Sequence, residues 1–289
     1  MRSQRLPGMA ALLTAGAVAL SGCATEPTPR THAAPAPPAA PLTTAPLTTA
    51  PAAPGTAAGG AQSAPSVGPG DNTAVAPRKT LKLGARGKAV TWMQKRLAEL
   101  GYRPGKVDGR YGGTTLAAVW AFQKVNGIKP TSTIAKRTWE ALEIPKRPRV
   151  LVKNGKPTRA EVDLTKQIMV LYRGGRVELI THVSSGSGVP YCETATWQGK
   201  EQRFCGSATT PAGNYRTTWR VSGWHRSYLG ELYNPIFFNG GIAFHGALSV
   251  PLYPASHGCV RMPMNVAQEL PGLLGKGVPV HVRGTFKRP

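Results

Sequence analysis

Acidic residues are scarce in this sequence. Its 289 residues include 13 Asp and Glu against 36 Lys and Arg, which gives a formal net charge of +23. The uncharged run nearest the N-terminus, residues 9–20, is too short to span a bilayer core of about 30 Å as a helix. A charge this positive normally indicates a nucleic-acid partner. The N-terminus argues against nucleic acid, because it has the residue pattern of an export signal.

Residues 24–77 lack aromatic side chains altogether and carry only three charges, at Glu26, Arg30 and Asp71. They nevertheless hold twelve of the 27 prolines, and the pentapeptide Pro-Leu-Thr-Thr-Ala occurs twice in succession from Pro41. Such a segment cannot bury a core, and its composition favours polyproline II. We therefore expect residues 24–78 to be a disordered linker that acts as a passive spacer. The remaining length predicts one or two folded units.

The first 23 residues have the pattern of an export signal. Arg2 and Arg5 precede the uncharged run, as in a signal peptide. The run ends in Leu20-Ser-Gly-Cys23, which resembles the bacterial lipobox, whose cysteine is acylated. This resemblance implies a lipoprotein signal peptide over residues 1–23. It also implies a lipid anchor at Cys23, which would hold the protein on the outer face of the cytoplasmic membrane and let it reach into the cell wall. The alternative is an ordinary cleaved signal peptide.

Residues 79–144 carry apolar side chains at helical spacing. Two glycine-bounded helices and a third short helix are indicated by Val90, Met93, Leu97 and Leu100, by Leu116, Val119 and Phe122, and by Trp139 and Leu142. Three short helices in about 65 residues make a minimal single core. Periodicity alone would fit any three-helix bundle.

The residue types in this segment resemble the peptidoglycan-binding domain of cell-wall enzymes. The most specific part is the turn Asp108-Gly109-Arg-Tyr-Gly112 followed by Val119 and Phe122-Gln123. The resemblance implies that the module binds peptidoglycan. The sequence departs from the family at residues 130–133, Pro-Thr-Ser-Thr, where a second Asp-Gly-like turn is usual. A degenerate module that only packs or spaces is the alternative.

After an interdomain linker at residues 145–157, the pattern changes to period two with β-branched runs. Strands are predicted at residues 161–164, 167–172, 177–183, 215–221, 241–245 and 278–282. One helix is predicted at residues 265–274, although Pro271 would interrupt it. The predicted fold is therefore a multidomain α + β protein, in which a small helical module precedes a mainly antiparallel β domain over residues 158–284.

The cysteines of an exported protein are expected to pair. Cys192 and Cys205 lie in one polar loop, so a disulfide between them is the simplest pairing. In the loop-entropy model it would contribute about 3 kcal/mol. Cys259 is then left as an odd thiol.

Cys259 lies in Ser256-His257-Gly258-Cys259-Val-Arg261, downstream of His245-Gly246. A cysteine nucleophile needs a base and small neighbours, and this stretch offers both. Glycine before the cysteine lets main-chain N–H groups point at a developing oxyanion. Two alternatives compete. The histidines and Cys259 could bind zinc, although no fourth ligand has convincing spacing, or the thiol could be an inert buried side chain.

The hexapeptide at residues 256–261, together with Phe244-His245-Gly246, resembles the signature of the L,D-transpeptidase catalytic domain of the YkuD type. Matches continue at Val162-Asp-Leu, Gln167, Ser184-Ser-Gly186 and Thr210-Pro-Ala-Gly-Asn-Tyr215. The interval between His245 and the hexapeptide is shorter than in many members, and residues 247–254 form a proline-containing loop. We expect this difference to change the shape of the part of the active-site cleft that binds the acceptor substrate.

The resemblance implies roles for individual residues. Cys259 is the nucleophile, His245 its general base, and His257 a neighbouring group that orients or assists. Gly258 and Cys259 N–H groups form the oxyanion hole, Arg261 binds substrate carbonyl or carboxylate groups, and Ser256 and Gly246 belong to the same substrate-binding surround. No metal or organic cofactor is implied.

The reaction implied is peptidoglycan cross-linking or remodelling. Cys259 attacks a tetrapeptide stem, releases D-alanine and forms a thioester that an amine of a second stem resolves. With water as acceptor the enzyme would be an L,D-carboxypeptidase, and with a spent site it would be an inactive wall-binding anchor. Aromatic side chains could form a lid over the cleft or belong to the β core; they are Trp219, Trp224, Tyr228, Tyr233, Phe237 and Phe238, with His225 and Arg226 beside them.

Overall fold

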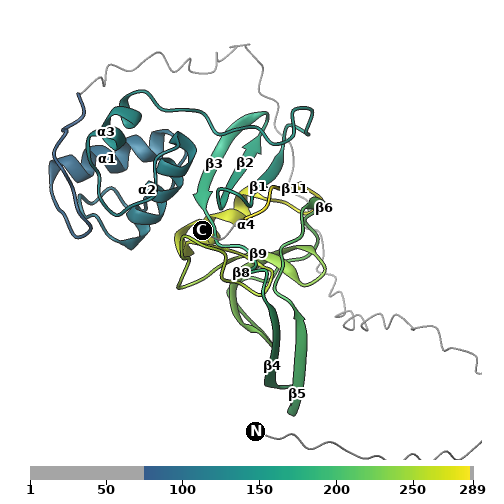
Figure 1. The fold of residues 1–289 in the computed structure, drawn as a ribbon. Coiled ribbons are helices and arrows are strands. Elements are labelled where there is room, and N and C mark those ends of the chain that lie inside the picture. Colours follow the sequence, from purple (N-terminus) through teal and green to yellow (C-terminus); the bar gives the residue numbers. More distant parts are fainter. Residues whose placement is uncertain (1–74, 287–289) are drawn as a thin grey trace, which may run out of the picture. The chain divides into compact units, whose positions relative to one another are not determined.

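The computed structural model describes residues 75–286 (Figure 1). These residues all belong to one compact unit of the chain. The expected signal peptide, the lipidation site at Cys23 and nearly all of the expected linker lie outside the described residues. Within residues 75–286, no helix has the length and apolar character needed to cross a membrane.

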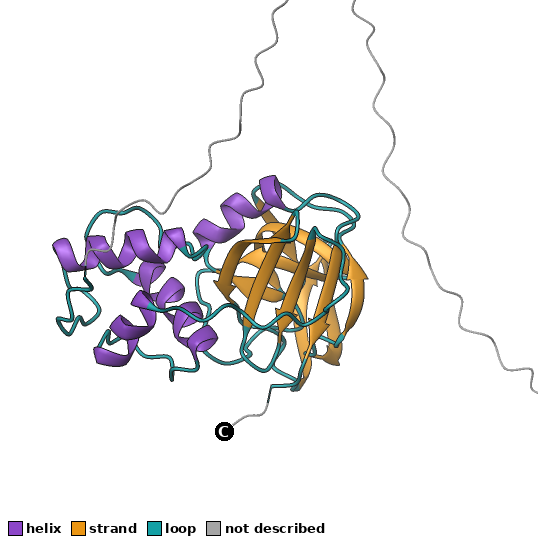
Figure 2. Cartoon of the chain, turned by 90° about the horizontal axis from the view of Figure 1, so that it is seen from above, coloured by secondary structure: helices purple, strands orange, loops and turns teal. Residues whose placement is uncertain are grey.

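The helical module contains α1 (Lys88–Glu99), α2 (Gly113–Asn126) and α3 (Lys136–Glu143), which gather in one group in Figure 2. The three predicted helices are thus confirmed. All but one of the predicted core positions are buried; Leu100 follows the end of α1 and is partly buried. Helix α2 ends at Gly127, which takes the left-handed conformation (φ 72°) that glycine adopts without strain.

Two buried glutamines hold the two turns of this module. The Gln94 side chain donates to the Asp108 carboxylate (3.0 Å) and accepts from the Gly109 N–H (2.9 Å). The bond from Gln94 and a bond from the Arg110 N–H (2.9 Å) lower the pKa of Asp108. In the turn that departs from the family pattern, the Gln123 side chain accepts from the Thr131 N–H (2.9 Å). The second turn therefore keeps a side-chain support without an Asp-Gly pair.

The β domain contains two sheets and a separate hairpin. Most neighbouring strands are antiparallel, as predicted, and the parallel pairs are β1 with β11 and β9 with β10. The first sheet has the order β3-β2-β1-β11-β6, from β1 (Arg159–Asp163), β2 (Ile168–Arg173), β3 (Arg176–His182), β6 (Gly213–Arg216) and β11 (Pro279–Arg283). The second has the order β10-β9-β8-β7, from β7 (Trp224–Ser227), β8 (Gly230–Asn239), β9 (Ile242–Gly246) and β10 (Val260–Met262).

The sequence prediction was wrong in the middle of this domain. The expected polar loop around Cys192 and Cys205 is the hairpin of β4 (Pro190–Trp197) and β5 (Lys200–Ser207). The strand expected at residues 215–221 ends at Arg216. The Thr217 backbone still bonds to Val278 and Gly277, but from Thr218 onward the chain bonds to Phe237 of β8 in the other sheet. Strands β7, β8 and β10 were not predicted.

Pro271 lies inside α4 (Met264–Leu273) without ending it. A proline leaves the carbonyl four residues earlier without its helical donor. That carbonyl belongs to Ala267, and it accepts a hydrogen bond from the Asn234 side chain of β8 (3.2 Å). The expected interruption is therefore absent because a neighbouring strand replaces the missing donor.

Strand β2 is buried on both faces. Met169 and Leu171 point into the core between the two sheets and α4. Ile168, Val170 and Tyr172 point the other way and join the apolar core of the helical module. Because side chains alternate along a strand, burial of both faces produces an unbroken apolar run. The module and the sheet thus share one hydrophobic core.

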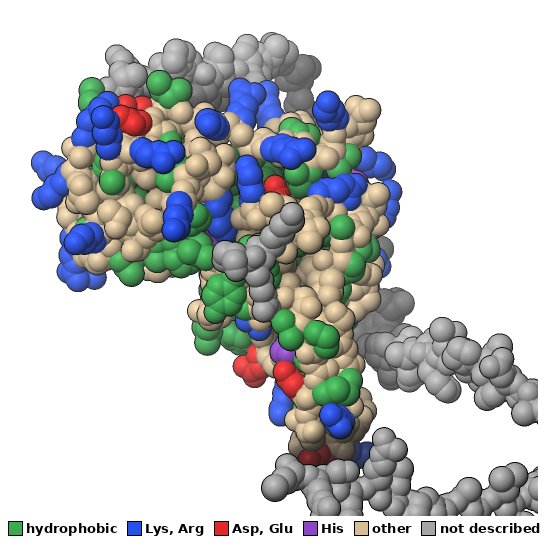
Figure 3. Space-filling view, viewed as in Figure 1, with side chains coloured by type: hydrophobic (Ala, Val, Ile, Leu, Met, Phe, Trp, Pro, Cys, Tyr) green, Lys and Arg blue, Asp and Glu red, His purple; other side chains and the backbone are tan. Residues whose placement is uncertain are grey.

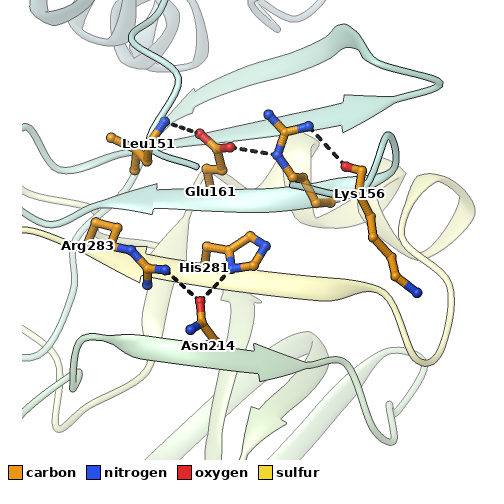
Figure 4. Close-up of polar contacts among 7 residues, drawn as sticks. Leu151, Lys156, Glu161, Asn214, His281 and Arg283 are labelled. Atoms are coloured by element: carbon orange, nitrogen blue, oxygen red, sulfur yellow. Dashed lines mark hydrogen bonds and ion pairs between the residues drawn. The ribbon is translucent and has the colours of Figure 1, made fainter. Parts of the chain in front are cut away.

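The segment between the module and the β domain is tied to the first sheet by polar contacts (Figure 4). The buried Glu161 carboxylate accepts from the Leu151 N–H (2.7 Å) and from the Arg159 guanidinium (2.6 Å). Arg159 also donates to the Lys156 carbonyl (3.0 Å). The expected interdomain linker therefore lies against the sheet at both of these points.

Basic side chains are dispersed over the molecular face in Figure 3 and are not gathered in one patch. Acidic side chains on that face are few. The high positive charge thus gives a broadly cationic surface on that face.

We predict that Phe122→Ala destabilises the whole described unit by about 3–5 kcal/mol, because it opens a cavity in the shared core. Phe122 is fully buried, and its ring centroid lies 5.5 Å from that of Tyr102. Denaturant unfolding of the full chain measures the change. Val107→Ala is the matched control, since Val107 is 43% exposed. Equal losses of unfolding free energy in the two variants would contradict the shared core.

Candidate active site

Parallel pairing of β9 and β10 places the predicted site residues side by side. His245 of β9 is in register with Arg261 of β10. Residues in register in a sheet project to the same face, and so does the residue two positions earlier on the strand, Cys259. The intervening side chains of Phe244 and Val260 enter the core instead. Strand periodicity thus brings thiol, imidazole and guanidinium to one surface.

This surface lines a cleft of about 710 Å³. Six of the seven predicted catalytic and substrate-binding residues lie on its wall: Cys259, His245, His257, Arg261, Ser256 and Gly258. Gly246 lies behind the wall. A Cβ at Gly246 would come within 2.8 Å of the Ala267 Cβ and 3.0 Å of the Met264 sulfur, so close packing requires glycine there.

His245 is held in one tautomer. Its Nδ1 lies 2.9 Å from the Gly246 carbonyl, which can only accept, so Nδ1 carries the proton and Nε2 has a free lone pair. Burial lowers the pKa of His245 to about 4; the hydrogen bond to Gly246 opposes this shift and the charge of Arg261 adds to it. His245 is therefore a neutral imidazole at pH 7, the form that can accept a proton.

The Cys259 thiol is neutral at rest as well. Burial raises its pKa above the ordinary value, while the Ala243 N–H and the Arg261 charge act in the opposite direction. The thiol points at the Gly241 carbonyl, with a sulfur-to-oxygen distance of 3.7 Å. Because the resting pair is thiol and imidazole, a nucleophilic sulfur requires proton transfer to a base.

The Ser256 side chain organises the turn before the cysteine. Its hydroxyl donates to the Cys259 carbonyl (2.5 Å) and accepts from the Gly258 N–H (3.0 Å). The expectation that the Gly258 N–H serves an oxyanion hole is therefore not met in this structure, since that N–H points at Ser256. Gly258 has a φ of 138°, a conformation that side-chain-bearing residues rarely adopt.

Three segments singled out in the sequence support this turn. The Gln167 side chain accepts from the Ser185 N–H (2.8 Å) and donates to the Ser185 hydroxyl (2.9 Å). The Ser185 carbonyl in turn accepts from the Ser256 N–H (3.0 Å). On the other side, the Thr210 hydroxyl accepts from the Gly186 N–H (2.8 Å) and donates to the Gly258 carbonyl (2.5 Å).

His257 contacts the hairpin and not the other site residues. Its Nε2 lies 2.7 Å from the Glu193 carboxylate, and its ring meets the edge of Tyr191 at a centroid distance of 4.7 Å. Tyr191 and Glu193 flank Cys192 on β4, and the expected disulfide between Cys192 and Cys205 is present across the hairpin. The two histidines of the motif therefore have different surroundings.

Sequence reasoning missed Glu193 and Tyr191 because it assigned their segment to a loop. One signal was available. Gln198 and Gly199 connect the two strands, both with positive φ (53° and 77°), as in a type I′ turn. A glycine-containing dipeptide between Thr-rich and aromatic residues is a recognised hairpin pattern.

The aromatic residues divide between the two roles expected for them. Trp219, Trp224, Tyr228 and Phe237 line the cleft, whereas Tyr233 and Phe238 do not. Phe238 is part of the core between the sheets, and Tyr233 packs against that core. Tyr228 stacks on Phe204 of the hairpin at a centroid distance of 4.2 Å, so the hairpin and the second sheet together form one aromatic wall.

The thiol and the two imidazoles do not converge on a common point. Within residues 75–286, no group of three or more His, Cys, Asp or Glu side chains is placed to hold a metal ion. One ring nitrogen of each histidine bonds elsewhere: His245 Nδ1 to the Gly246 carbonyl and His257 Nε2 to the Glu193 carboxylate.

Comparison with protein families identifies two matches. Residues 157–282 match the L,D-transpeptidase catalytic domain, YkuD, and residues 86–142 match a peptidoglycan binding domain. Both matches coincide with the β domain and the helical module described above.

A solved structure supports the same assignment, and a second one is less similar. The L,D-transpeptidase (residues 123–326) of Xylanimonas cellulosilytica is 37% identical, with a TM-score of 0.62, over 71% of this chain and 98% of that one. An L,D-transpeptidase of Stackebrandtia nassauensis is 24% identical, with a TM-score of 0.40, over 71% of this chain and 96% of that one. The chain has both matched domains and is 37% identical to a solved relative along nearly all of that relative's length. We conclude that it belongs to the L,D-transpeptidase family.

Proposed function

We propose that this transpeptidase modifies peptidoglycan through a thioester on Cys259, with His245 as general base. The observation that carries the proposal is the placement of Cys259, His245 and Arg261 on one face of β9 and β10, within one cleft. The wall-binding module fits a substrate in the cell wall, where a peptidoglycan-acting enzyme must work after export.

The acylation step follows from the resting protonation states. As Cys259 attacks the carbonyl before the terminal D-alanine of a tetrapeptide stem, the thiol proton passes to His245 Nε2. The tetrahedral intermediate collapses, the C–N bond breaks, and the imidazolium returns that proton to the departing D-alanine amine. The products are a thioester and free D-alanine, with His245 neutral again.

Resolution of the thioester repeats these transfers with a different nucleophile. The side-chain amine of a second stem attacks the thioester carbonyl and gives its proton to His245. The C–S bond breaks, and the Cys259 sulfur recovers a proton. The product is a new amide bond between two stems, and no other co-reactant is consumed.

The remaining residues have supporting roles in this proposal. We assign Arg261 to binding a substrate carbonyl or carboxylate, because no ion pair within residues 75–286 engages its guanidinium. The Cys259 N–H donates to the oxyanion, while Gly258 and Ser256 shape the turn. Gly246 fixes the His245 tautomer, and His257, held by Glu193, orients the wall beside the sulfur.

The proposal also includes attachment of the protein to the membrane. We propose that residues 1–23 are a lipoprotein signal peptide, that Cys23 carries the lipid, and that residues 24–78 link it to a wall-binding module at 79–144. The catalytic domain would then occupy residues 158–284, after the segment at 145–157. This arrangement would hold the enzyme on the outer face of the membrane within reach of peptidoglycan.

With disaccharide-tetrapeptide as the only substrate, we expect the full chain to release D-alanine and form a dimer joined between two diamino residues. Mass spectrometry detects both products. Cys259→Ala should abolish both while leaving thermal unfolding unchanged, because the thiol is replaced by a smaller apolar group. Tripeptide monomer as the sole product would reassign the enzyme as an L,D-carboxypeptidase, and full activity of Cys259→Ala would remove the thioester mechanism.

His245→Ala should slow acylation of Cys259 by a carbapenem by about 10²–10⁴-fold, the usual effect of removing a general base. His257→Ala should have a much smaller effect, since His257 bonds to Glu193. Acylation is measured by mass spectrometry at pH 7 and above about pH 9, where a thiol with ordinary pKa near 8.5 ionises unaided. The His245→Ala variant should regain part of its acylation rate at high pH. The gain is only partial because burial raises the pKa of the Cys259 thiol.

The pH profile of the wild type gives a second readout. Because the pKa of His245 is lowered to about 4, the base stays unprotonated as pH falls from 7 to 5, and acylation should decline only as pH approaches 4. A decline centred near the ordinary imidazole pKa of about 6.5 would contradict the assigned environment. For the two variants, slower acylation of His257→Ala than of His245→Ala both at pH 7 and above about pH 9 would reverse the roles of the two histidines.

A further inference from the structure

A lysine of the helical module lies in the interface with the β domain. Lys124 is in the last turn of α2, and its ammonium donates to the Gln167 carbonyl (3.1 Å) and to His182 Nδ1 (2.8 Å). It is mostly buried, and burial lowers its pKa to about 7. A buried ammonium is costly unless its hydrogen bonds are satisfied, so these two contacts hold Lys124 in place.

His182 makes a second hydrogen bond from the opposite nitrogen of its ring. It is the last residue of β3 and is completely buried, with the edge of its ring against Trp120 at a centroid distance of 5.4 Å. His182 Nε2 lies 2.9 Å from the Val250 carbonyl, which can only accept, so Nε2 carries the proton. Nδ1 then carries a lone pair that accepts from Lys124 at 2.8 Å, which is the shorter of its two contacts, since the Gln167 carbonyl lies 3.4 Å away.

Val250 belongs to residues 247–254, here called the catalytic loop, which joins His245-Gly246 to the Ser256–Cys259 turn. The loop is also held at Tyr253, whose carbonyl accepts from the Ser184 hydroxyl (2.7 Å). The second Lys124 partner, Gln167, holds Ser185, which bonds to Ser256. Lys124 therefore contacts two separate supports of the segment that presents Cys259.

We propose that Lys124 is a positioning residue for the transpeptidase reaction, through which the wall-binding module fixes the catalytic loop and the placement of Cys259. This assignment rests on the proposed function of Cys259. The module then does more than hold the enzyme on its substrate, because one of its side chains completes the supporting structure of the active site.

The test compares Lys124→Met and Arg103→Met in the full chain. Arg103 is a matched control because it is also a cation of the module at the interface, paired with Glu269 (2.8 Å) and Glu178 (3.6 Å). Within residues 75–286, none of its hydrogen bonds or ion pairs reaches the catalytic loop. Each variant is characterised by thermal unfolding, by the first-order rate of Cys259 acylation at saturating carbapenem, and by the concentration that gives half that rate.

We expect Lys124→Met to lower the saturating acylation rate about tenfold or more, since small displacements of reacting groups cost this much. The half-saturating concentration should stay within about twofold of the wild-type value, because most residues of the cleft wall, among them those of the β4–β5 hairpin, β7 and β8, lie outside the catalytic loop. Arg103→Met should acylate at the wild-type rate. Equal rates for Lys124→Met and the wild type would overturn the proposal, and so would an equal slowing by Arg103→Met.

A double variant covers the case in which Lys124→Met does not fold. Lys124→Met with His182→Leu removes both partners of the Lys124–His182 bond, which costs less than leaving one of them buried and unpaired. The Val250 carbonyl, which is only partly buried, loses its donor. The double variant should fold, lack the contact with Val250 and acylate slowly; a folded double variant with the wild-type rate would overturn the proposal. If the cysteine mechanism itself is wrong, the wild type will show no acylation of Cys259, a result distinct from each of these.

Discussion

The parallel pairing of β9 with β10 is the constraint on which the site depends. Register places His245 beside Arg261, and strand periodicity brings Cys259 to the same face. A slip of one residue would turn these side chains into the core and bring Phe244 and Val260 to the surface. The surrounding bonds from Ser184, Ser185 and Thr210 hold the short strand and its turn in that register.

The site combines two groups that are both uncharged at rest. Burial raises the pKa of the Cys259 thiol and lowers that of the His245 imidazole, so no ion pair forms before substrate arrives. In the proposed reaction, charge develops only as the proton moves, and the Arg261 guanidinium is near enough to influence both groups. This differs from a cysteine enzyme whose sulfur is a resting thiolate beside an imidazolium.

Much of the fold and of the site could be predicted from the sequence, for definite reasons. The three helices have strict periodicity, and the doubly buried β2 appears as an unbroken apolar run. The hexapeptide places His257 and Cys259 close together because they are neighbours in the chain. The β4–β5 hairpin could not be recognised from apolar alternation, because most of its side chains are exposed. The pairing of Glu193 with His257 depends on that hairpin, and the support of α4 by Asn234 depends on distant strands.

The shared core of the helical module and β2 has a consequence for the modular evolution of this architecture. Ile168, Val170, Tyr172 and Ile180 of the β domain are packed among the residues of the helices. A β domain transferred to another protein without these helices would expose this apolar surface to water and risk association with other chains. Substitutions on one side of this boundary therefore constrain those on the other.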